Sequence, residues 1–253
     1  MKVFKLLVIL LLASGTSNAQ QATVKAPTVD DILNKYYENS GGKALWDSLK
    51  SVRMTGQVSV QGMEIPVTII QTAAGQQKVS IKFQGQEITQ VAFDGEKGWN
   101  TDFMNQKAEK MSAEANANTK QQVMDFPDAL HNYKAKGYLA QLEGKEMIEG
   151  KEAFKVKLIK TPVKLDGQEQ ENIVYYFFDP ENYLPVAMRN MSLSGQTKGA
   201  SVETLLDDYR QVQGLLFPFS SKISYNGQPG ETIQLENIET NAKFDPKLFA
   251  FPE

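Results

Sequence analysis

The sequence predicts a mainly β protein: a strongly curved antiparallel sheet of about eleven strands, with helices packed over its concave side. Three observations lead to this prediction. Apolar and polar residues alternate with period two along most of the chain. Turns that contain glycine separate these runs about every ten to twelve residues, which is typical of sandwiches, barrels and curved sheets. Only residues 28–50 and 111–135 have a helical pattern.

The composition excludes several classes of protein before any motif is considered. The chain has 253 residues, a net charge of −3, no cysteine and one histidine. Without cysteine there is no thiolate nucleophile, zinc knuckle or iron–sulfur cluster. A single histidine excludes a multi-histidine metal site and argues against a Ser-His-Asp triad. The mildly acidic charge gives no indication of a nucleic-acid partner, and an apolar content of 41% is sufficient for a packed core.

The first 19 residues have the pattern of a cleaved secretory signal. Lys2 and Lys5 form a basic start, residues 6–13 are an apolar run, and Ala19 precedes the expected cleavage. The run is shorter than the ~20 residues of a membrane span, and no later stretch is apolar enough to be one. We expect a flexible leader at 20–27 and a single domain at 28–253. Without a cysteine to carry a lipid anchor, the exported protein should be soluble, in the periplasm or outside the cell.

Two helices are predicted to open the domain. Thr28 suits an N-cap, Asp31 supplies a partial capping box, and apolar residues at 32, 33, 36 and 37 recur at helical spacing. The Gly-Gly pair at 41–42 ends this helix. A second short helix follows, with Leu45 and Leu49 on one side and Trp46 beside them.

The strands follow from residue 52, where the period changes from 3.6 to two. Two helical segments, at 111–124 and 127–135, interrupt them. We expect strands at 52–60, 63–72, 77–83, 86–93, 138–149, 151–160, 170–178, 183–193, 201–212, 215–226 and 231–240. Residues 173–178 are apolar on both faces, so we expect cover on each side, from the rest of the sheet and from a helix or loop.

No constellation of residues indicates catalysis. His131 lies on a predicted amphipathic helix without a carboxylate motif around it, and adjacent acids on a strand point to opposite faces. The sequence contains no nucleophile elbow, phosphate loop, dinucleotide fingerprint or calcium loop. We therefore predict no catalytic residue, no metal site and no cofactor, and we expect the protein not to be an enzyme.

Several motifs in order along the chain resemble a known superfamily. They are Phe-Asp-Gly at 93–95 followed by Gly-Trp at 98–99, Phe-Asp-Pro at 178–180, Asp-Tyr-x-x-Val-x-Gly-x-x-Phe-Pro at 208–218, and Phe-Asp-Pro-x-Leu-Phe at 244–249. Together with the opening helix they resemble the outer-membrane lipoprotein-sorting proteins of the LolA/LolB-like superfamily, particularly those of Bacteroidetes-type bacteria. The resemblance covers nearly the whole mature chain.

This resemblance implies a half-open antiparallel barrel of about eleven strands with a helical lid and an apolar cavity that binds acyl chains. It implies a periplasmic carrier whose partners are lipid acyl chains or lipoproteins, and possible partner proteins in the inner and outer membranes. The family's carrier latches its lid with an arginine in its early strands. Arg53 shares a face with Thr55 and Gln57, so we expect it to point to solvent and do not assign it this role.

The residues predicted to line the cavity are apolar positions on the expected strands and helices. They are Trp46, Met54, Val58, Ile69, Phe93, Trp99, Met124, Leu130, Tyr175, Phe177 and Met188. A slip of one residue in a strand would move its side chains to the other face. Two other classes of function stay open: an envelope structural or interaction module with a filled core, and a secreted hydrolase or glycan binder that uses carboxylates on the concave side.

Overall fold

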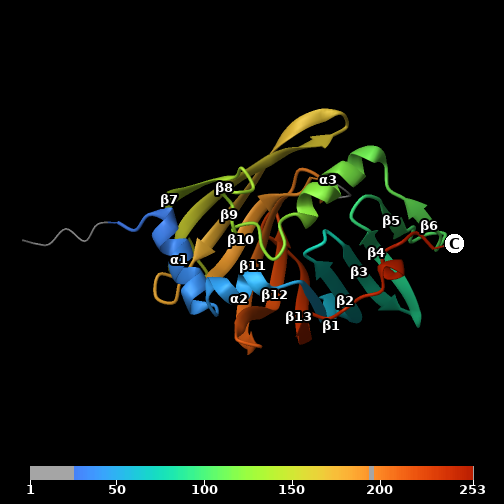
Figure 1. Cartoon of the computed structure of the whole chain (residues 1–253), viewed down its shortest axis with the longest axis horizontal. Coiled ribbons are helices and arrows are strands. Elements are labelled where there is room, and N and C mark those ends of the chain that lie inside the picture. The colour runs from blue at the N-terminus through green and yellow to red at the C-terminus, as the bar shows by residue number, and fades with distance from the viewer. Residues whose placement is uncertain (1–25, 194–196, 253) are drawn as a thin grey trace, which may run out of the picture.

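The computed structural model describes residues 26–193 and 197–252. The predicted signal at 1–19, and all of the predicted leader except residues 26 and 27, lie outside the described residues. Within them, thirteen strands form one antiparallel sheet in the order β6-β5-β4-β3-β2-β1-β13-β12-β11-β10-β9-β8-β7. The sheet is curved and unclosed, as the arrangement of its strands in Figure 1 shows.

The strands of this sheet are β1 Ser51–Val60, β2 Met63–Thr72, β3 Gln77–Phe83, β4 Gln86–Phe93, β5 Gly98–Thr101, β6 Ala108–Lys110, β7 Leu139–Ile148, β8 Lys151–Leu165, β9 Gln168–Phe178, β10 Pro185–Met191, β11 Ser201–Val212, β12 Leu215–Tyr225 and β13 Gln228–Thr240. The helices are α1 Val29–Asn39, α2 Lys43–Ser48, α3 Ala113–Val123 and the 3₁₀ helix η2 Pro246–Leu248. All eleven predicted strands are present. The two additional strands, β5 and β6, are too short to show an alternation of their own.

The first helix begins as predicted. Thr28 Oγ1 accepts a hydrogen bond from the Asp31 amide at 3.2 Å, and the Asp31 carboxylate accepts one from the Thr28 amide at 2.8 Å, which completes the capping box. The side chains at the four predicted apolar positions of α1 are buried. Trp46 of α2 and the C-cap residue Leu49 are buried, whereas Leu45, predicted on the same side as Leu49, is 41% exposed.

A close approach of backbone fixes the turn between these helices. Gly41 has a φ of +120°, and a Cβ there would lie 2.2 Å from the carbonyl oxygen of Gly214. The Leu216 amide also donates to the Ser40 carbonyl at 3.0 Å. Only glycine fits this position, so the Gly-Gly pair both ends α1 and attaches it to the β11–β12 turn.

The predicted helix at 127–135 is wrong. The segment consists of turns, in which Asp128 Oδ1 accepts hydrogen bonds from the amides of Leu130 at 2.7 Å and His131 at 2.8 Å. Asn132 has a φ of +52°. An aspartate side chain that bonds to the amides ahead of it competes with helical hydrogen bonding, and a residue in the left-handed region ends it.

The two faces of the sheet differ in their cover. We call the face that α1, α2 and residues 124–138 cover the inner face, and the opposite face the outer face. The main core lies on the inner face of β7–β13, where α1, α2 and the 124–138 segment bury residues such as Ile32, Trp46, Leu130, Phe178 and Phe217. We call this region the closed half. None of the helices in the described parts of the chain is long and apolar enough to cross a bilayer.

Candidate functional site

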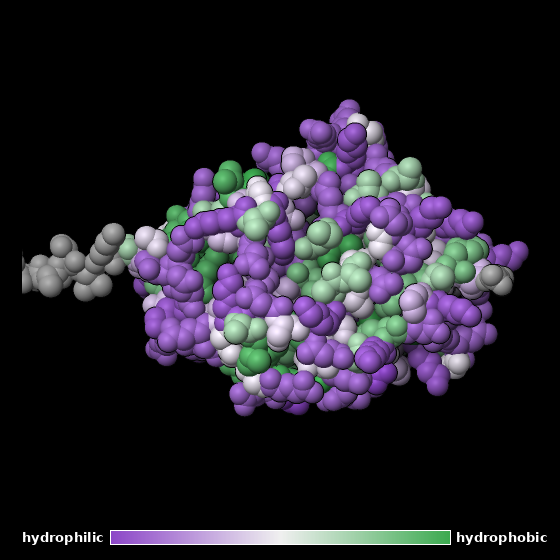
Figure 2. Space-filling view, viewed as in Figure 1, coloured by the Kyte–Doolittle hydropathy of each residue, from purple (hydrophilic) through white to green (hydrophobic). Residues whose placement is uncertain are grey.

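The inner face of β1–β3 and β13 carries aliphatic side chains that are only half-buried. Strand pairing places Met54 opposite Ile69, Ile69 opposite Val79, and Val58 opposite Ile233. We call this set the open patch; its members are Met54, Val58, Ile69, Val79, Ile81 and Ile233, each of intermediate exposure. Figure 2 shows hydrophobic surface at the centre of the molecule, below α3. The open patch is therefore apolar surface that the protein's own core does not fully cover.

The structure brings together some of the predicted lining residues. Met54, Val58 and Ile69 belong to the open patch. Met188 also faces inward and packs against the core of the closed half, in which Trp46 and Leu130 are buried. Met54 and Ile233 of the open patch border the same core. The Trp46 indole nitrogen there donates to Ser40 Oγ at 3.0 Å.

Two predicted lining residues lie on the wrong face. Tyr175 and Phe177 point outward, and the inner face of β9 carries Val174, Tyr176 and Phe178 instead. In the described part of the chain, the apolar residues that pack around Phe177, such as Ile148, Ala153 and Ala187, lie on strands, whereas a helix or loop was expected there. The Arg189 guanidinium lies 4.8 Å from the centre of the Phe177 ring, and the Lys155 ammonium lies 4.7 Å from that of Tyr175. Long charged side chains can cover apolar surface in this way.

Trp99 is also on the outer face. It pairs with Ala92 and Lys110, and its indole nitrogen donates to the Phe249 carbonyl at 3.1 Å, under the C-terminal segment. Phe93 faces inward by its pairing with Gln77 but is fully buried.

The remaining outcomes concern Met124, Arg53 and three residues that were not predicted. Met124, which follows α3, is 62% exposed. Arg53 lies on the outer face as expected, where it forms an ion pair with Glu239 at 2.9 Å. Val79, Ile81 and Ile233 were missed, although the alternation at 77–83 and 231–240 could have indicated them.

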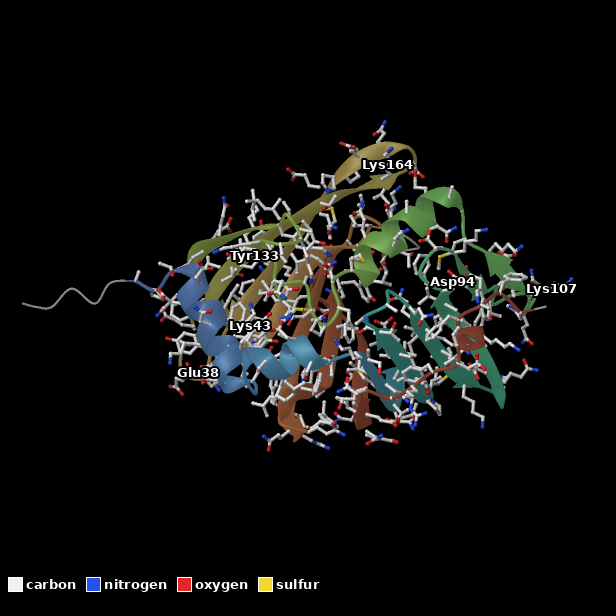
Figure 3. The ribbon with its side chains drawn as sticks, viewed as in Figure 1. Glu38, Lys43, Asp94, Lys107, Tyr133 and Lys164 are labelled. Atoms are coloured by element: carbon white, nitrogen blue, oxygen red, sulfur yellow. The ribbon has the colours of Figure 1, made fainter. Side chains whose placement is uncertain are left out.

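The helix α3 bridges strands near the two opposite edges of the sheet. At one end the Glu114 carboxylate accepts hydrogen bonds from the amides of Asp166 at 2.9 Å and Gly167 at 2.8 Å, at the tip of the β8–β9 hairpin. Asn118 exchanges two hydrogen bonds with the backbone of Lys164, which Figure 3 shows beside α3. On the other side, the Gly98 amide donates to Asn116 Oδ1 at 2.6 Å. Polar contacts of this kind hold α3 in place, and Val123 is its one buried residue.

A variant that removes the contacts to the hairpin should loosen α3 selectively. In Glu114→Ala/Asn118→Ala, four hydrogen bonds are lost, and we expect the free energy of local opening to fall by about 1–2 kcal/mol, since exposed hydrogen bonds each contribute little. Amide exchange in α3 should then be roughly tenfold faster. Asn172→Ala, which removes a bond to the Thr161 carbonyl within the same hairpin, is the control. Unchanged exchange in α3 would contradict this role for the contacts.

A buried polar cluster fixes the 124–138 segment over the closed half. The Asp128 carboxylate accepts hydrogen bonds from the hydroxyls of Tyr36 at 3.4 Å and Tyr37 at 3.2 Å, and burial raises its pKa although the His131 amide opposes the shift. Asp125 accepts a hydrogen bond from Tyr138 and forms an ion pair with Lys160. These carboxylates are thus occupied by donors of the protein itself, which is a structural arrangement.

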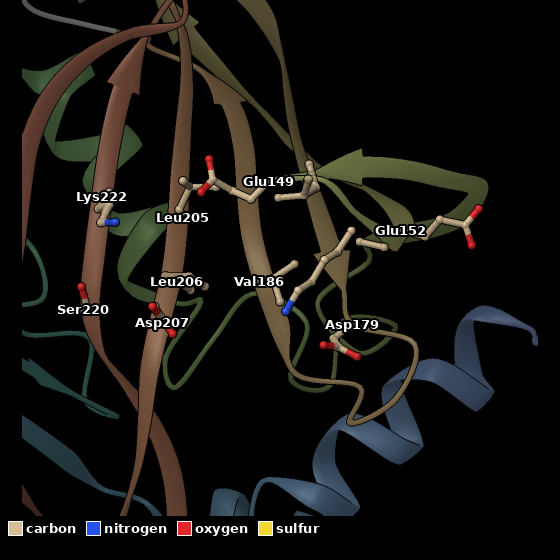
Figure 4. A pocket seen from close by; sticks show the side chains of 12 residues that line it. Glu149, Glu152, Asp179, Val186, Leu205, Leu206, Asp207, Ser220 and Lys222 are labelled. Atoms are coloured by element: carbon tan, nitrogen blue, oxygen red, sulfur yellow. The ribbon is translucent and has the colours of Figure 1, made fainter.

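The outer face has a pocket that is distinct from the open patch. Its volume is about 200 Å³, and apolar residues such as Ala153, Val186 and Leu205 line it together with charged side chains. Figure 4 shows Asp207 and Ser220 on neighbouring strands and Asp179 across from them. Sites for drug-sized ligands usually span about 300–1,000 Å³, so the pocket is too small for a long acyl chain. Among the described residues, no group of three or more His, Asp or Glu side chains could hold a metal ion.

Comparison with solved structures identifies the fold. A LolA superfamily protein from Nitrosomonas europaea is 14% identical, with a TM-score of 0.53 over 89% of this chain and 98% of that one. A DUF1329 family protein from Desulfovibrio piger is 10% identical, with a TM-score of 0.53 over 85% and 95% of the two chains. A domain from Vibrio parahaemolyticus, named for outer membrane lipoprotein sorting, is 10% identical, with a TM-score of 0.51 over 86% and 94%. No protein-family model and no curated protein matches the sequence. The chain therefore has the LolA-like fold. The residue pattern predicted its curved antiparallel sheet, and the family resemblance implied the half-open form.

Proposed function

Starting from the LolA-like fold, we propose that this protein is a periplasmic carrier that binds lipid or lipoprotein acyl chains on the open patch. The observation that carries the proposal is the row of half-buried aliphatic side chains on the inner face, of which Ile69 and Val79 are paired neighbours. Each methylene group that leaves water contributes about 0.8 kcal/mol, so an acyl chain laid on this surface supplies a large driving force. The name of the Vibrio protein supports cargo of this class.

The contacts of α3 support a route for loading and release. Because α3 is attached mainly by polar contacts at the sheet edges, it can move away without exposing a large apolar core. The residues at 1–19 support export, since they have the pattern of a cleaved signal. We include membrane proteins that deliver and receive the cargo among the partners, and we propose no reaction for the protein.

The second candidate function is an envelope structural or interaction module with a filled core. It is favoured by the closed half, where Tyr36, Trp46 and Phe178 pack closely, with the Tyr36 ring 6.4 Å from that of Trp46 and 5.8 Å from that of Phe178. A hydrolase that uses inner-face carboxylates receives no such support, because Asp125 and Asp128 are engaged in hydrogen bonds.

Lipid uptake separates the two candidates. We expect native mass spectrometry of protein purified from its host to show a lipid or lipoprotein adduct on a chain that begins at residue 20. Delipidated protein should then bind a fluorescent fatty acid, and Ile69→Glu should weaken binding at least about tenfold, since its carboxylate would face the buried chain. Leu205→Glu is the matched control, because Leu205 is also a half-buried aliphatic residue but lies on the outer face, away from the open patch. A ligand-free protein that takes up no fatty acid would refute the carrier.

A further inference from the structure

The loop between β5 and β6 presents two large apolar side chains to solvent. Phe103 is 57% exposed and Met104 is 91% exposed, which makes Met104 the most exposed large hydrophobic residue in the described part of the chain. The loop, residues 102–107, lies at the end of the molecule where Figure 3 labels Lys107. A single exposed apolar residue needs no explanation, but two adjacent ones at a loop tip form a small surface that other apolar groups can cover.

The loop is held rigid by its own hydrogen bonds. Asp102 Oδ1 accepts from the amides of Met104 and Asn105, both at 2.8 Å. The Gln106 amide donates to the Asp102 carbonyl at 2.8 Å, and the Lys107 amide donates to Asn105 Oδ1 at the same distance. The amides of Met104, Asn105, Gln106 and Lys107 are therefore paired within the loop. These four paired amides lower the cost of moving the tip into an apolar medium, because each keeps its hydrogen bond there.

Apolar side chains continue from this tip toward the open patch. The Phe103 ring centre lies 5.9 Å from that of Phe83. Phe83 is the last residue of β3 and, two residues after Ile81, shares its inner face. The tip is thus connected by aromatic contact to the strand that carries the proposed acyl-binding surface.

The charge around the tip favours an anionic surface. Lys82 precedes Phe83, Lys107 ends the loop, and Lys110 lies on β6 with its ammonium group 4.9 Å from the ring centre of Phe251. None of these lysines forms an ion pair with another residue that the structure describes. The carboxylates nearby are Asp102 in the loop, Glu109 on β6, and Glu87 opposite Lys82, the last of which is ion-paired with Lys78. The three lysines therefore leave an excess of one positive charge over Asp102 and Glu109. Exposed apolar side chains with free lysines beside them are typical of segments that bind the interface of an anionic bilayer.

We propose that the 102–107 loop docks the protein on anionic lipid bilayers. Phe103 and Met104 enter the boundary between headgroups and acyl chains, while Lys82, Lys107 and Lys110 contact anionic headgroups. The further role of the loop, as a path by which acyl chains reach the open patch, rests on the proposed function. Docking itself requires only the exposed tip and its charge.

Vesicle sedimentation tests the proposal. We expect the full mature protein to sediment with vesicles of phosphatidylethanolamine and phosphatidylglycerol and only weakly with neutral phosphatidylcholine vesicles, with binding reduced by salt. Phe103→Ser/Met104→Ser should lower the apparent partition at least about tenfold, because apolar area leaves the lipid. Leu139→Ser/Met147→Ser is the matched control, since these residues of β7 are 61% and 58% exposed, and it should retain binding.

Several outcomes would overturn docking by this tip. The first is that the wild type does not bind anionic vesicles. The second is that the tip variant binds them as well as the wild type, and the third is that the control variant loses as much binding as the tip variant. A wild type that self-associates through the tip in sedimentation velocity without binding vesicles would also refute it. Fatty-acid uptake from solution separates the two proposals: the tip variant should retain uptake. A protein that binds vesicles but takes up no fatty acid would contradict the carrier alone.

Discussion

Replacing Phe178 by alanine is expected to lower the free energy of unfolding by about 3–5 kcal/mol. The side chain has no exposed area, and its ring lies 5.8 Å from that of Tyr36 and 6.3 Å from that of Tyr176. It also pairs with Phe154 across β8 and β9. Because α1 and the sheet are fixed by many other contacts, the space left by the ring cannot collapse, and the loss should approach the upper end of the range.

Phe177→Ala provides the comparison for this effect. Phe177 is equally buried but belongs to the small outer cluster with Ile148, Ala153 and Ala187, beneath the Arg189 side chain. That side chain can settle into the space, so we expect a loss at least about 1 kcal/mol smaller. Urea unfolding of both variants measures the difference. Equal losses would contradict the assignment of the main core to the inner face.

The second large effect is a loss of stability at alkaline pH. Burial, reinforced by the Asp128 carboxylate, raises the pKa of both Tyr36 and Tyr37 well above the ordinary value. Burial likewise raises the pKa of Tyr176. In the unfolded chain these phenols ionise near pH 10, whereas in the folded protein they stay neutral. Their contribution to stability is therefore complete below about pH 10 and is lost as the pH rises toward the raised values.

The slope of this loss is measurable. Each tyrosine should contribute about 1.4 kcal/mol per pH unit above pH 10, so three contribute about 4 kcal/mol per unit. Urea unfolding between pH 9 and 11.5 gives the slope for the wild type. Burial also raises the pKa of Tyr138 and Tyr209, which add to the wild-type slope. Tyr37→Phe should lower the slope by about 1.4 kcal/mol per pH unit and Tyr36→Phe/Tyr37→Phe by about 2.8. Identical slopes in the wild type and the double variant would show that these phenols are not held neutral by the fold.

Sequence patterns determined the local elements of this protein where the pattern extended over enough residues. Thr28 and Asp31 indicated the start of α1, and alternation indicated eleven strands that are all present. The same alternation placed Met54, Val58 and Ile69 on one face, because polar neighbours mark the opposite face of β1. The first strands of the candidate site could therefore be predicted.

Only the tertiary structure decided where the pattern is symmetric or short. In β9, residues 173–178 are apolar on both faces, so alternation cannot show which face is the inner one. Phe178 pairs with Phe154 and Tyr176 pairs with Met188, and this pairing places both on the inner face and Phe177 on the outer face. Trp99 lies in a four-residue strand whose face depends on its partner strands and on the C-terminal segment that covers it.

The sequence pattern also did not determine the conformation of the segment that covers the closed half. The residues from 127 to 135 have helix-compatible composition, but contacts between Asp128 and tyrosines some 90 positions earlier hold them as turns. The sequence by itself thus determined which segments are strands and which face a regularly alternating strand buries. The tertiary structure decided which apolar residues fill the core and which remain open, because that choice depends on pairing between segments far apart in the chain.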